Sequence, residues 1–396
     1  MIVVAEPGDD KSVRAVSRRT RLLNLLLFVI TCGLILEVCA RIDDWVAFGA
    51  PLLERYDHSR LLANDDDGVQ HNVPGARFQK WRINRLGFRG PEVSVPKPPG
   101  TSRIICFGSS ETFGLYEPEG RDWPSVLGGL LSDAPGIEVI NSSVVGLTGS
   151  KRLAYFDRYV MPAEPDVVIL YVAFLEYPKL APRAREERAA SAKGAGTRPA
   201  TPRPPIRAGA IIDNIRVLPK LRLAIKKSLP PKIATAISTE VTRLQLRRRE
   251  RQVLGDAAPL ERVNAEDLDA FERDLEDSVV GIRRRGIAVV LTTYPTLLNG
   301  KNQFLYEQVL IDFRRVLPVL SRQGVADAAG LFNDRIRRVA RRLDVPLVDN
   351  DALIPKTTEY FGDNVHYTEK GAELVARNFH RFFEASRASA EQHQPR

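Results

Sequence analysis

The sequence predicts an α/β fold with a doubly wound, five-stranded parallel sheet and an N-terminal transmembrane helix. Two observations predict the sheet. Short apolar runs alternate with helical segments, and the run 165–174 is apolar at nearly every position, as expected for a strand covered by helices on both faces. A third observation, an apolar stretch of membrane-spanning length at 22–40, predicts the helix.

The order of the apolar runs defines the expected elements. Five runs are expected as strands: 103–108, the first part of 137–146, 165–174, 287–295 and 345–350. Four segments have the apolar spacing of helices: 123–133, 265–286, 330–344 and 368–385. Because strands and helices alternate, the connections predict a parallel sheet with helices on both faces.

The N-terminus predicts a membrane anchor. The apolar stretch 22–40 is preceded by five basic residues: Lys11, Arg14, Arg18, Arg19 and Arg21. Such a flank stays in the cytoplasm, so residues 1–21 are expected inside and the C-terminal bulk outside. Asn24 and Glu37 weaken the stretch. A cleaved signal peptide is the alternative, but no clear small-residue cleavage site follows, which favours an uncleaved signal anchor.

The rest of the chain divides by composition. Residues 41–100 are expected as an irregular lead-in, 101–385 as the main domain and 386–396 as a tail. A basic insertion at about 178–255 interrupts the main domain, with 19 Lys or Arg against 5 Asp or Glu, although the whole chain carries only +9. The insertion is either a solvated cationic segment or a contact for a membrane surface or an anionic polymer.

Several classes of function are excluded or given no support. The positive charge lies in the insertion, so the main domain has no basic groove for nucleic acid. Three cysteines do not form a disulfide framework, no His, Cys or Asp cluster has metal-ligand spacing, and no glycine-rich loop suits a nucleotide. The sequence therefore predicts no metal and no cofactor.

Two segments carry candidate chemistry. The first strand ends in "FGSSETFG", which places a serine hydroxyl at the carboxyl edge of the sheet, where open α/β folds bind ligands. Near the C-terminus, "YFGDNVHYTEKG" places Asp363 three residues before His366 in a polar loop. A serine needs a base to take its proton, and a carboxylate must orient that base. The two segments together predict a Ser-His-Asp site.

The motifs resemble those of the SGNH/GDSL hydrolases. The blocks "FGSSETFG", "INSSVVGLTGS" and "DNVHYTEKG" occur in the family order, and "RINRLGFRGPE" is similar to membrane-anchored bacterial members. The resemblance implies a flavodoxin-like, three-layer α/β/α fold. It also implies that Ser110 is the nucleophile, His366 the base and Asp363 its partner, with the backbone N–H groups of Ser110 and Gly146 in the oxyanion hole.

Two positions depart from the family pattern. Ser109 stands where the first block has Asp. After the third strand, where the family has an Asn that completes the oxyanion hole, this chain has Leu175 and Glu176. A leucine donates no hydrogen bond, so either Asn141 or a backbone N–H substitutes, or the activity is slow, or the site has drifted from hydrolysis. The candidate pocket residues are Asn141, Leu175 and Glu176. A structural role in its own loop is the other expectation for Asn141.

The expected function follows from site and location together. The leading hypothesis is a membrane-tethered serine esterase or O-acyl transferase that forms an acyl-enzyme on Ser110 and acts on ester groups of envelope glycans or lipids. The expected location is the bacterial inner membrane, with a single span and the catalytic domain outside the cytoplasm. The alternative is a weak or inactive SGNH-like domain that binds an acylated polymer, which Leu175 favours.

Overall fold

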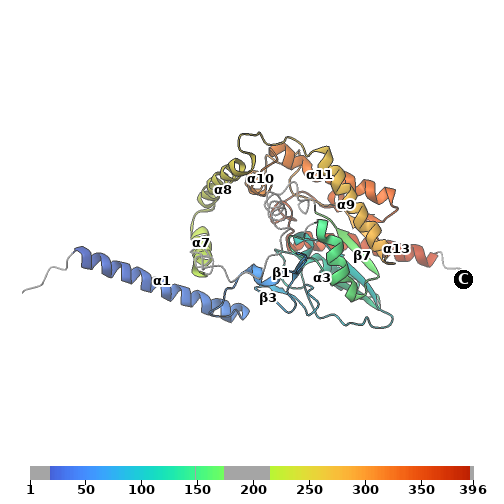
Figure 1. The fold of residues 1–396 in the computed structure, drawn as a ribbon, viewed down its shortest axis with the longest axis horizontal. Coiled ribbons are helices and arrows are strands. Elements are labelled where there is room, and N and C mark those ends of the chain that lie inside the picture. Colours follow the sequence, from blue (N-terminus) through green and yellow to red (C-terminus); the bar gives the residue numbers. More distant parts are fainter. Residues whose placement is uncertain (1–17, 148, 174–214, 393–396) are drawn as a thin grey trace, which may run out of the picture. The chain divides into compact units, whose positions relative to one another are not determined.

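The computed structural model describes residues 18–147, 149–173 and 215–392. The chain divides into two compact units. The smaller unit comprises residues 1–55 and 205–228, and the larger unit comprises 56–204 and 229–396. The candidate site lies entirely in the larger unit, which in Figure 1 is coloured from light blue to red apart from α7, the yellow-green helix of the smaller unit.

A five-stranded parallel sheet forms the centre of the larger unit. Its strands are β5 (Ser102–Phe107), β6 (Ile137–Asn141), β7 (Val167–Tyr171), β8 (Ala288–Thr292) and β9 (Leu347–Val348). Their spatial order is β6-β5-β7-β8-β9, and all neighbours are parallel. The predicted doubly wound sheet is confirmed. The winding direction reverses between β5 and β7, and such a switch point opens a crevice at the carboxyl ends of the strands.

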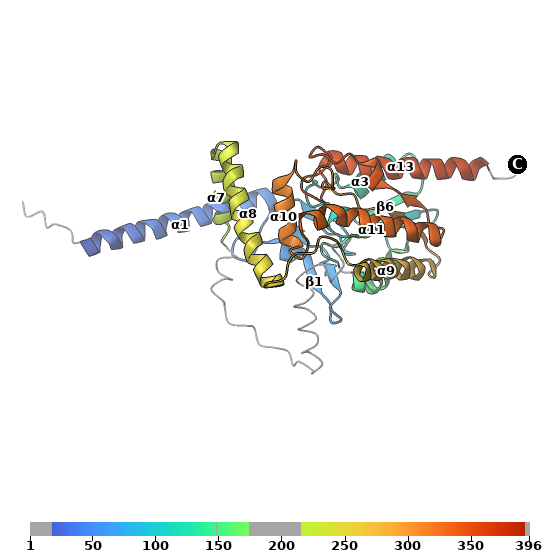
Figure 2. The same ribbon diagram turned by 90° about the horizontal axis from the view of Figure 1, so that it is seen from above.

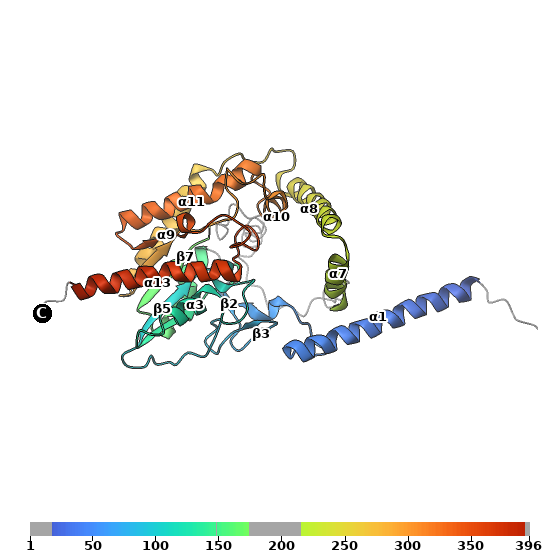
Figure 3. The ribbon, with the colours of Figure 1, turned by 180° about the vertical axis from the view of Figure 1, so that it is seen from behind.

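Two pairs of helices cover the two faces of the sheet (Figure 2). On one face, α3 (Trp123–Leu130) packs on α13 (Glu369–Gln392), with Trp123 and Phe379 stacked at a ring-centroid distance of 5.0 Å. On the other, α9 (Ala265–Arg283) packs on α11 (Arg322–Arg342), with Phe271 and Phe332 at 4.8 Å. Figure 3 shows the first pair from behind. These layers form the predicted three-layer α/β/α fold.

Some helices differ from their predicted bounds. Helix α11 begins at Arg322, ahead of the predicted start at 330, because Ser321 caps it by accepting the N–H of Gly324 at 3.1 Å. Two further helices, α8 (Pro231–Leu254) and α10 (Glu307–Val316), were not predicted as elements of the fold. They pack together, and an ion pair of 2.5 Å joins Arg314 of α10 to Glu250 of α8. The second part of the basic insertion is therefore an ordered helix of the larger unit.

The lead-in, predicted to be irregular, contains short antiparallel pairs. These are β1 (Leu62–Asn64) with β2 (Gln70–Asn72), and β3 (Arg77–Phe78) with β4 (Trp81–Arg82). Strands this short give no period-2 pattern, which explains why the sequence did not predict them. Leu61, Phe78 and Ile83 pack with Phe113 in a small apolar cluster. The lead-in thereby covers the short helix that carries the candidate nucleophile.

The smaller unit contains two described helices, α1 (Arg18–Phe48) and α7 (Val217–Ser228). Helix α1 is long and apolar enough to cross a membrane; its most apolar 18-residue window has a mean hydropathy of 2.4, and none of that window is buried. It continues past the predicted end at residue 40 through a polar stretch that includes Asp43 and Asp44. The apolar stretch and its polar continuation form one unbroken helix.

Candidate active site

The candidate nucleophile lies at the turn between β5 and α2 (Ser110–Phe113). Gly108 begins this turn, and a Cβ there would lie 2.4 Å from the Thr112 hydroxyl and 3.0 Å from the Tyr171 carbonyl oxygen. Only glycine fits such a close approach. The turn ends at Ser110, the first residue of α2, so the Ser110 hydroxyl lies at the carboxyl edge of the sheet.

Ser110, His366 and Asp363 form a continuous hydrogen-bonded chain. The Ser110 Oγ lies 2.9 Å from His366 Nε2, and His366 Nδ1 lies 2.7 Å from Asp363 Oδ2. The serine follows the second strand of the sheet in spatial order, and the other two residues lie in the loop before α13. The structure therefore brings together the three residues that the sequence motifs single out, in the order of a nucleophile, a base and an orienting carboxylate.

The Asp363 carboxylate is held by four hydrogen bonds. Its Oδ1 accepts the backbone N–H groups of Val365 and His366, both at 2.8 Å, and its Oδ2 accepts the Tyr116 hydroxyl at 2.8 Å besides the imidazole. Burial acts to raise the pKa of Asp363. The hydrogen bond and charge of His366 and the two backbone N–H groups outweigh burial and lower this pKa to about 2. Asp363 is therefore ionised at neutral pH.

The charge state of His366 depends on the same environment. Its side chain is 16% exposed, so the imidazole is reachable from solvent. Burial acts to lower the pKa of His366, but the hydrogen bond to Asp363 and the nearby carboxylate of Glu111 outweigh burial, and the pKa is raised above 6.5. A higher pKa makes the neutral imidazole a stronger base toward Ser110.

Gly146, a predicted oxyanion donor, lies beside the nucleophile turn. Its φ of +78° is in the left-handed region that favours glycine. Its N–H donates to the Ser109 Oγ at 3.2 Å. Of the two backbone N–H groups expected in the oxyanion hole, that of Gly146 is therefore already hydrogen-bonded to the Ser109 hydroxyl. Leu175 and Glu176, which stand where the family pattern has its oxyanion-hole Asn, lie outside the described residues. The next residue, Tyr177, lies outside them as well.

Asn141 has a structural role in the described site. Its Nδ2 donates to the Thr112 carbonyl at 2.9 Å and to Asp122 Oδ2 at 3.0 Å, while its Oδ1 accepts the Ser143 N–H at 3.2 Å. The side chain is buried. Its amide donors are therefore committed to the core beneath the nucleophile helix rather than facing a pocket. This matches the structural expectation for Asn141 and differs from its expected role as a pocket residue.

A buried carboxylate, Glu111, follows Ser110 in α2 and was not singled out from the sequence. It is 2% exposed, and its Oε1 accepts the hydroxyl of Tyr294. The Tyr294 ring contacts Tyr171 edge to face at 5.6 Å, and the hydroxyl of Tyr171 lies 2.8 Å from that of Tyr367, the neighbour of His366. Tyr294 is itself fully buried.

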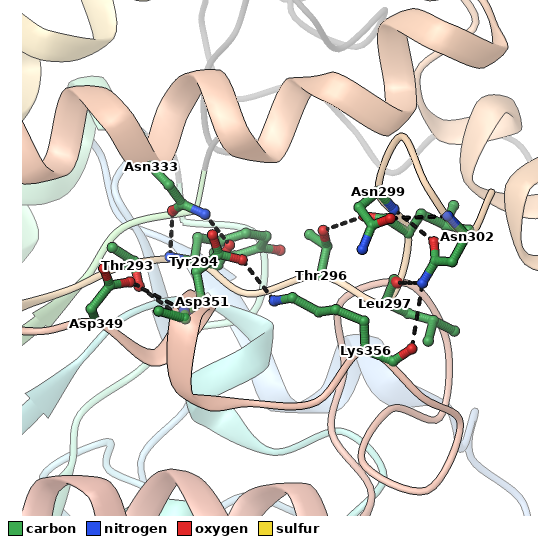
Figure 4. A network of polar contacts seen from close by, with 12 residues as sticks. Thr293, Tyr294, Thr296, Leu297, Asn299, Asn302, Asn333, Asp349, Asp351 and Lys356 are labelled. Atoms are coloured by element: carbon green, nitrogen blue, oxygen red, sulfur yellow. Dashed lines mark hydrogen bonds and ion pairs between the residues drawn. The ribbon is translucent and has the colours of Figure 1, made fainter.

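The loop after β8 is fixed by a polar network, drawn in Figure 4. At its start, the Tyr294 N–H donates to Asn333 Oδ1 at 2.6 Å, and Asn333 Nδ2 donates back to the Tyr294 carbonyl at 2.9 Å. At its end, Asn302 Nδ2 donates to the Leu297 carbonyl at 2.7 Å, and Asn302 Oδ1 accepts the Asn299 N–H at 2.8 Å. Hydrogen bonds therefore fix both ends of the loop.

This loop in turn holds the segment that carries the base. Asn364, between Asp363 and His366, accepts the Leu297 N–H at its carbonyl (2.8 Å) and the Leu298 N–H at its Oδ1 (2.9 Å). Its side chain is buried. Asn364 therefore connects the loop after β8 to the loop that carries Asp363 and His366.

Asp349, which follows β9, has a capping role. It accepts the Thr293 hydroxyl at 2.9 Å and pairs with Arg337 at 2.9 Å, and it caps α12 (Asn350–Leu353) through the N–H of Ala352. Across the described residues, no group of three His, Cys, Asp or Glu side chains could hold a metal ion.

Arg89 of the lead-in motif supports the segment after the nucleophile. It is buried, and its guanidinium donates to the carbonyls of Phe113 and Gly114 and, at 3.0 Å each, to those of Glu117 and Pro118. This segment carries Tyr116, which holds Asp363. The "RINRLGFRGPE" block therefore acts at the site indirectly, by shaping the loop on which Tyr116 lies.

Comparison with known proteins gives matches among solved structures. No family model matches the chain, and no curated protein matches it. A lipase/acylhydrolase from Enterococcus faecalis is similar at 14% identity and a TM-score of 0.40, covering 72% of this chain and 97% of its own. A catalytic mutant of an acetylxylan esterase from Geobacillus stearothermophilus has 15% identity and a TM-score of 0.39, covering 72% and 95%. A GDSL-like lipase from Bacteroides thetaiotaomicron is similar at 13% identity and a TM-score of 0.37, covering 74% of this chain and 93% of its own.

Proposed function

We propose that the chain is a serine ester hydrolase that works through an acyl-enzyme on Ser110. The observation that carries the proposal is the unbroken hydrogen-bonded chain from Ser110 Oγ through His366 to Asp363, with both contacts below 3 Å. A serine placed on a helix merely as a cap has no need of an imidazole oriented by a second, ionised group.

The reaction follows from this arrangement. As the Ser110 Oγ attacks an ester carbonyl carbon, its proton passes to His366 Nε2, and the ionised Asp363 stabilises the imidazolium. The carbonyl oxygen becomes an oxyanion facing the N–H groups of Ser110 and Gly146, which requires the Ser109 hydroxyl to turn away. The imidazolium then gives its proton to the departing alcohol, leaving the acyl group on Ser110. Attack by water, or by another hydroxyl, releases the acyl group with His366 again as base.

The substrate class in this proposal follows from the expected location. Helix α1 is apolar enough to cross a membrane, and the basic residues before it favour a cytoplasmic N-terminus. The catalytic unit then lies outside the cytoplasmic membrane of a bacterium, where ester-bearing glycans and lipids are found. Acetyl or longer acyl groups on such polymers are the proposed substrates, with water as acceptor in a hydrolase and a sugar hydroxyl in a transferase.

A second candidate is a binding domain for an acylated polymer. Leu175 supports it, because a leucine at the position of the family Asn removes one oxyanion donor, and such a loss costs about 10²–10³ in kcat. The two candidates differ in whether Ser110 is activated as a nucleophile.

A fluorophosphonate probe separates these two candidates. The full-length chain in detergent is labelled beside Ser110→Ala, His366→Ala and the neighbouring control Ser109→Ala. Labelling that is lost in the first two variants and kept in the control supports the ester hydrolase. A folded wild-type chain that takes no label supports the binding domain, and labelling that persists in Ser110→Ala contradicts the assignment of the nucleophile.

A further inference from the structure

In the smaller unit, Glu37 caps the start of α7. Its Oε2 accepts the backbone N–H groups of Arg216 at 2.9 Å and Val217 at 3.0 Å, and its Oε1 accepts the Arg41 side chain at 2.7 Å. The first N–H groups of a helix have no partner within it, so a carboxylate from another helix can satisfy them. The acidic residue that interrupts the apolar stretch of α1 therefore has a structural role.

A second set of contacts fixes one side of α7 to the polar end of α1. Lys220 Nζ lies 2.7 Å from Asp44 Oδ1 and also pairs with Asp43. Arg216 Nη2 donates to the Glu54 carbonyl at 3.0 Å. Helix α7 is thus held at the C-terminal end of the apolar stretch of α1. Its Lys220 side faces Asp43 and Asp44, which follow that stretch.

The other side of α7 presents an apolar stripe to solvent. Leu218, Leu221 and Ile225 are 46%, 47% and 51% exposed, and their spacing of three and four residues places them on one face of the helix. Lys220 and Lys227 lie on a different face of α7 from this stripe. The helix contains no acidic residue. This combination of an apolar stripe and a purely cationic polar face is typical of helices that lie in a membrane interface.

We propose that α7 is an interfacial helix, with Leu218, Leu221 and Ile225 inserted into the surface of the anionic bilayer that α1 crosses. The contact with Glu37 places the start of α7 level with the outer end of the apolar stretch 22–40. Lys227 on the other face then lies at the depth of lipid phosphates, whose charge it complements, while Lys220 stays paired with Asp43 and Asp44. The inference rests on the proposed membrane tether and is independent of the ester chemistry.

Two leucines of α7 provide a matched pair for the test. Leu221 and Leu223 are exposed to similar extents, 47% and 52%, but residues two positions apart lie on different faces of a helix. Each is replaced by cysteine in a full-length chain that carries Cys32→Ala and Cys39→Ala, while the buried Cys106 is kept. The cysteine is labelled with an environment-sensitive fluorophore, and the chain is reconstituted in phosphatidylcholine–phosphatidylglycerol vesicles.

The expected result is opposite quenching at the two positions. A nitroxide on the lipid chains quenches the label at Leu221→Cys about twofold more than at Leu223→Cys, and aqueous iodide shows the reverse preference. Equal quenching at both positions overturns the proposal. So does a Leu221→Cys label shielded from both quenchers, because that result means that protein, not lipid, covers the stripe.

A third label separates this inference from the tether on which it rests. Cys32 lies within the apolar stretch, and in a chain with Cys39→Ala its label reports whether α1 is in the bilayer. Lipid quenching at Cys32 without a difference between Leu221→Cys and Leu223→Cys overturns the interfacial helix and leaves the tether standing. A Cys32 label in water overturns both. Fluorophosphonate labelling of the same vesicles reports on the ester hydrolase separately.

Discussion

The Tyr116 hydroxyl donates to Asp363 Oδ2 at 2.8 Å, the same carboxylate oxygen that His366 Nδ1 contacts at 2.7 Å. The Tyr116 ring also stands edge-on to the imidazole, with centroids 5.6 Å apart. Tyr116 therefore contacts both Asp363 and His366. Its segment is held by Arg89 of the lead-in, which donates to the carbonyls of Glu117 and Pro118.

Replacing Tyr116 by Phe removes this hydrogen bond and keeps the ring. We expect kcat/KM for an activated ester to fall about threefold to tenfold, the effect of one lost hydrogen bond. Carboxylate orientation matters in the transition state, so the loss should appear in kcat more than in KM. Tyr306→Phe, which removes a phenol hydroxyl at the start of α10, is the control. An unchanged kcat in Tyr116→Phe contradicts a positioning role.

The pH profile should report the raised pKa of His366. The base acts when the imidazole is neutral, so activity rises as pH increases through the pKa of the folded protein. The midpoint of kcat/KM is expected above the ordinary histidine value of 6.5. Asp363→Asn removes a negative charge and should move the midpoint down while lowering the rate. A wild-type midpoint at or below 6.5 is inconsistent with the described environment.

Ser109→Ala should free the Gly146 N–H. In the described site that N–H donates to the Ser109 hydroxyl at 3.2 Å, and an oxyanion must compete for it. We expect kcat to stay level or to rise by up to about tenfold, the contribution of one hydrogen bond. Steady-state kinetics on an activated acetyl ester measures this. A large fall in kcat shows instead that the Ser109 hydroxyl supports the turn or the reaction.

Leu175→Asn should restore the side-chain donor of the family pattern. If the missing donor limits the rate, kcat should rise by about 10². Leu175→Ala is the matched control, since it removes the leucine without adding a donor. Equal kinetics of the two variants means that another group fills that part of the oxyanion hole.

Asn364→Ala should loosen the catalytic loop. Leu298 loses the acceptor of its buried N–H, which should cost about 1–2 kcal/mol of unfolding free energy in urea. Activity should fall as well, because Asp363 and His366 flank the residue. Asn364→Asp keeps an acceptor oxygen and should recover much of both. A variant with normal stability and activity would show that the link between the two loops is dispensable.

The sequence predicts the parts of this protein that repeat locally. Apolar runs such as 103–108 and 165–174 predict strands because a strand covered on both faces must be apolar along its length. Ser110, Asp363 and His366 could be singled out because their motifs are short and local. Their hydrogen-bonded geometry could not, since it depends on how five strands are ordered.

The supporting residues leave no comparable local signal. Tyr116 meets Asp363 across 247 positions, and Tyr294 meets Glu111 across 183. A single aromatic or acidic residue in a polar segment has many possible partners, so its role is known only once the fold brings the partner near. The role of Glu37 likewise depends on a distant partner. In the sequence it only interrupts an apolar stretch, whereas in the structure it caps α7.

The separation of Ser110 from His366 by 256 positions has a consequence for how the protein is made. The serine is synthesised early, whereas the base and its carboxylate belong to the loop that precedes the last helix, α13. A nascent chain therefore carries an unactivated hydroxyl until nearly all of the domain has emerged and β9 has joined the sheet. The hydrogen bond between Ser110 and His366 can therefore form only after nearly all of the domain has been synthesised.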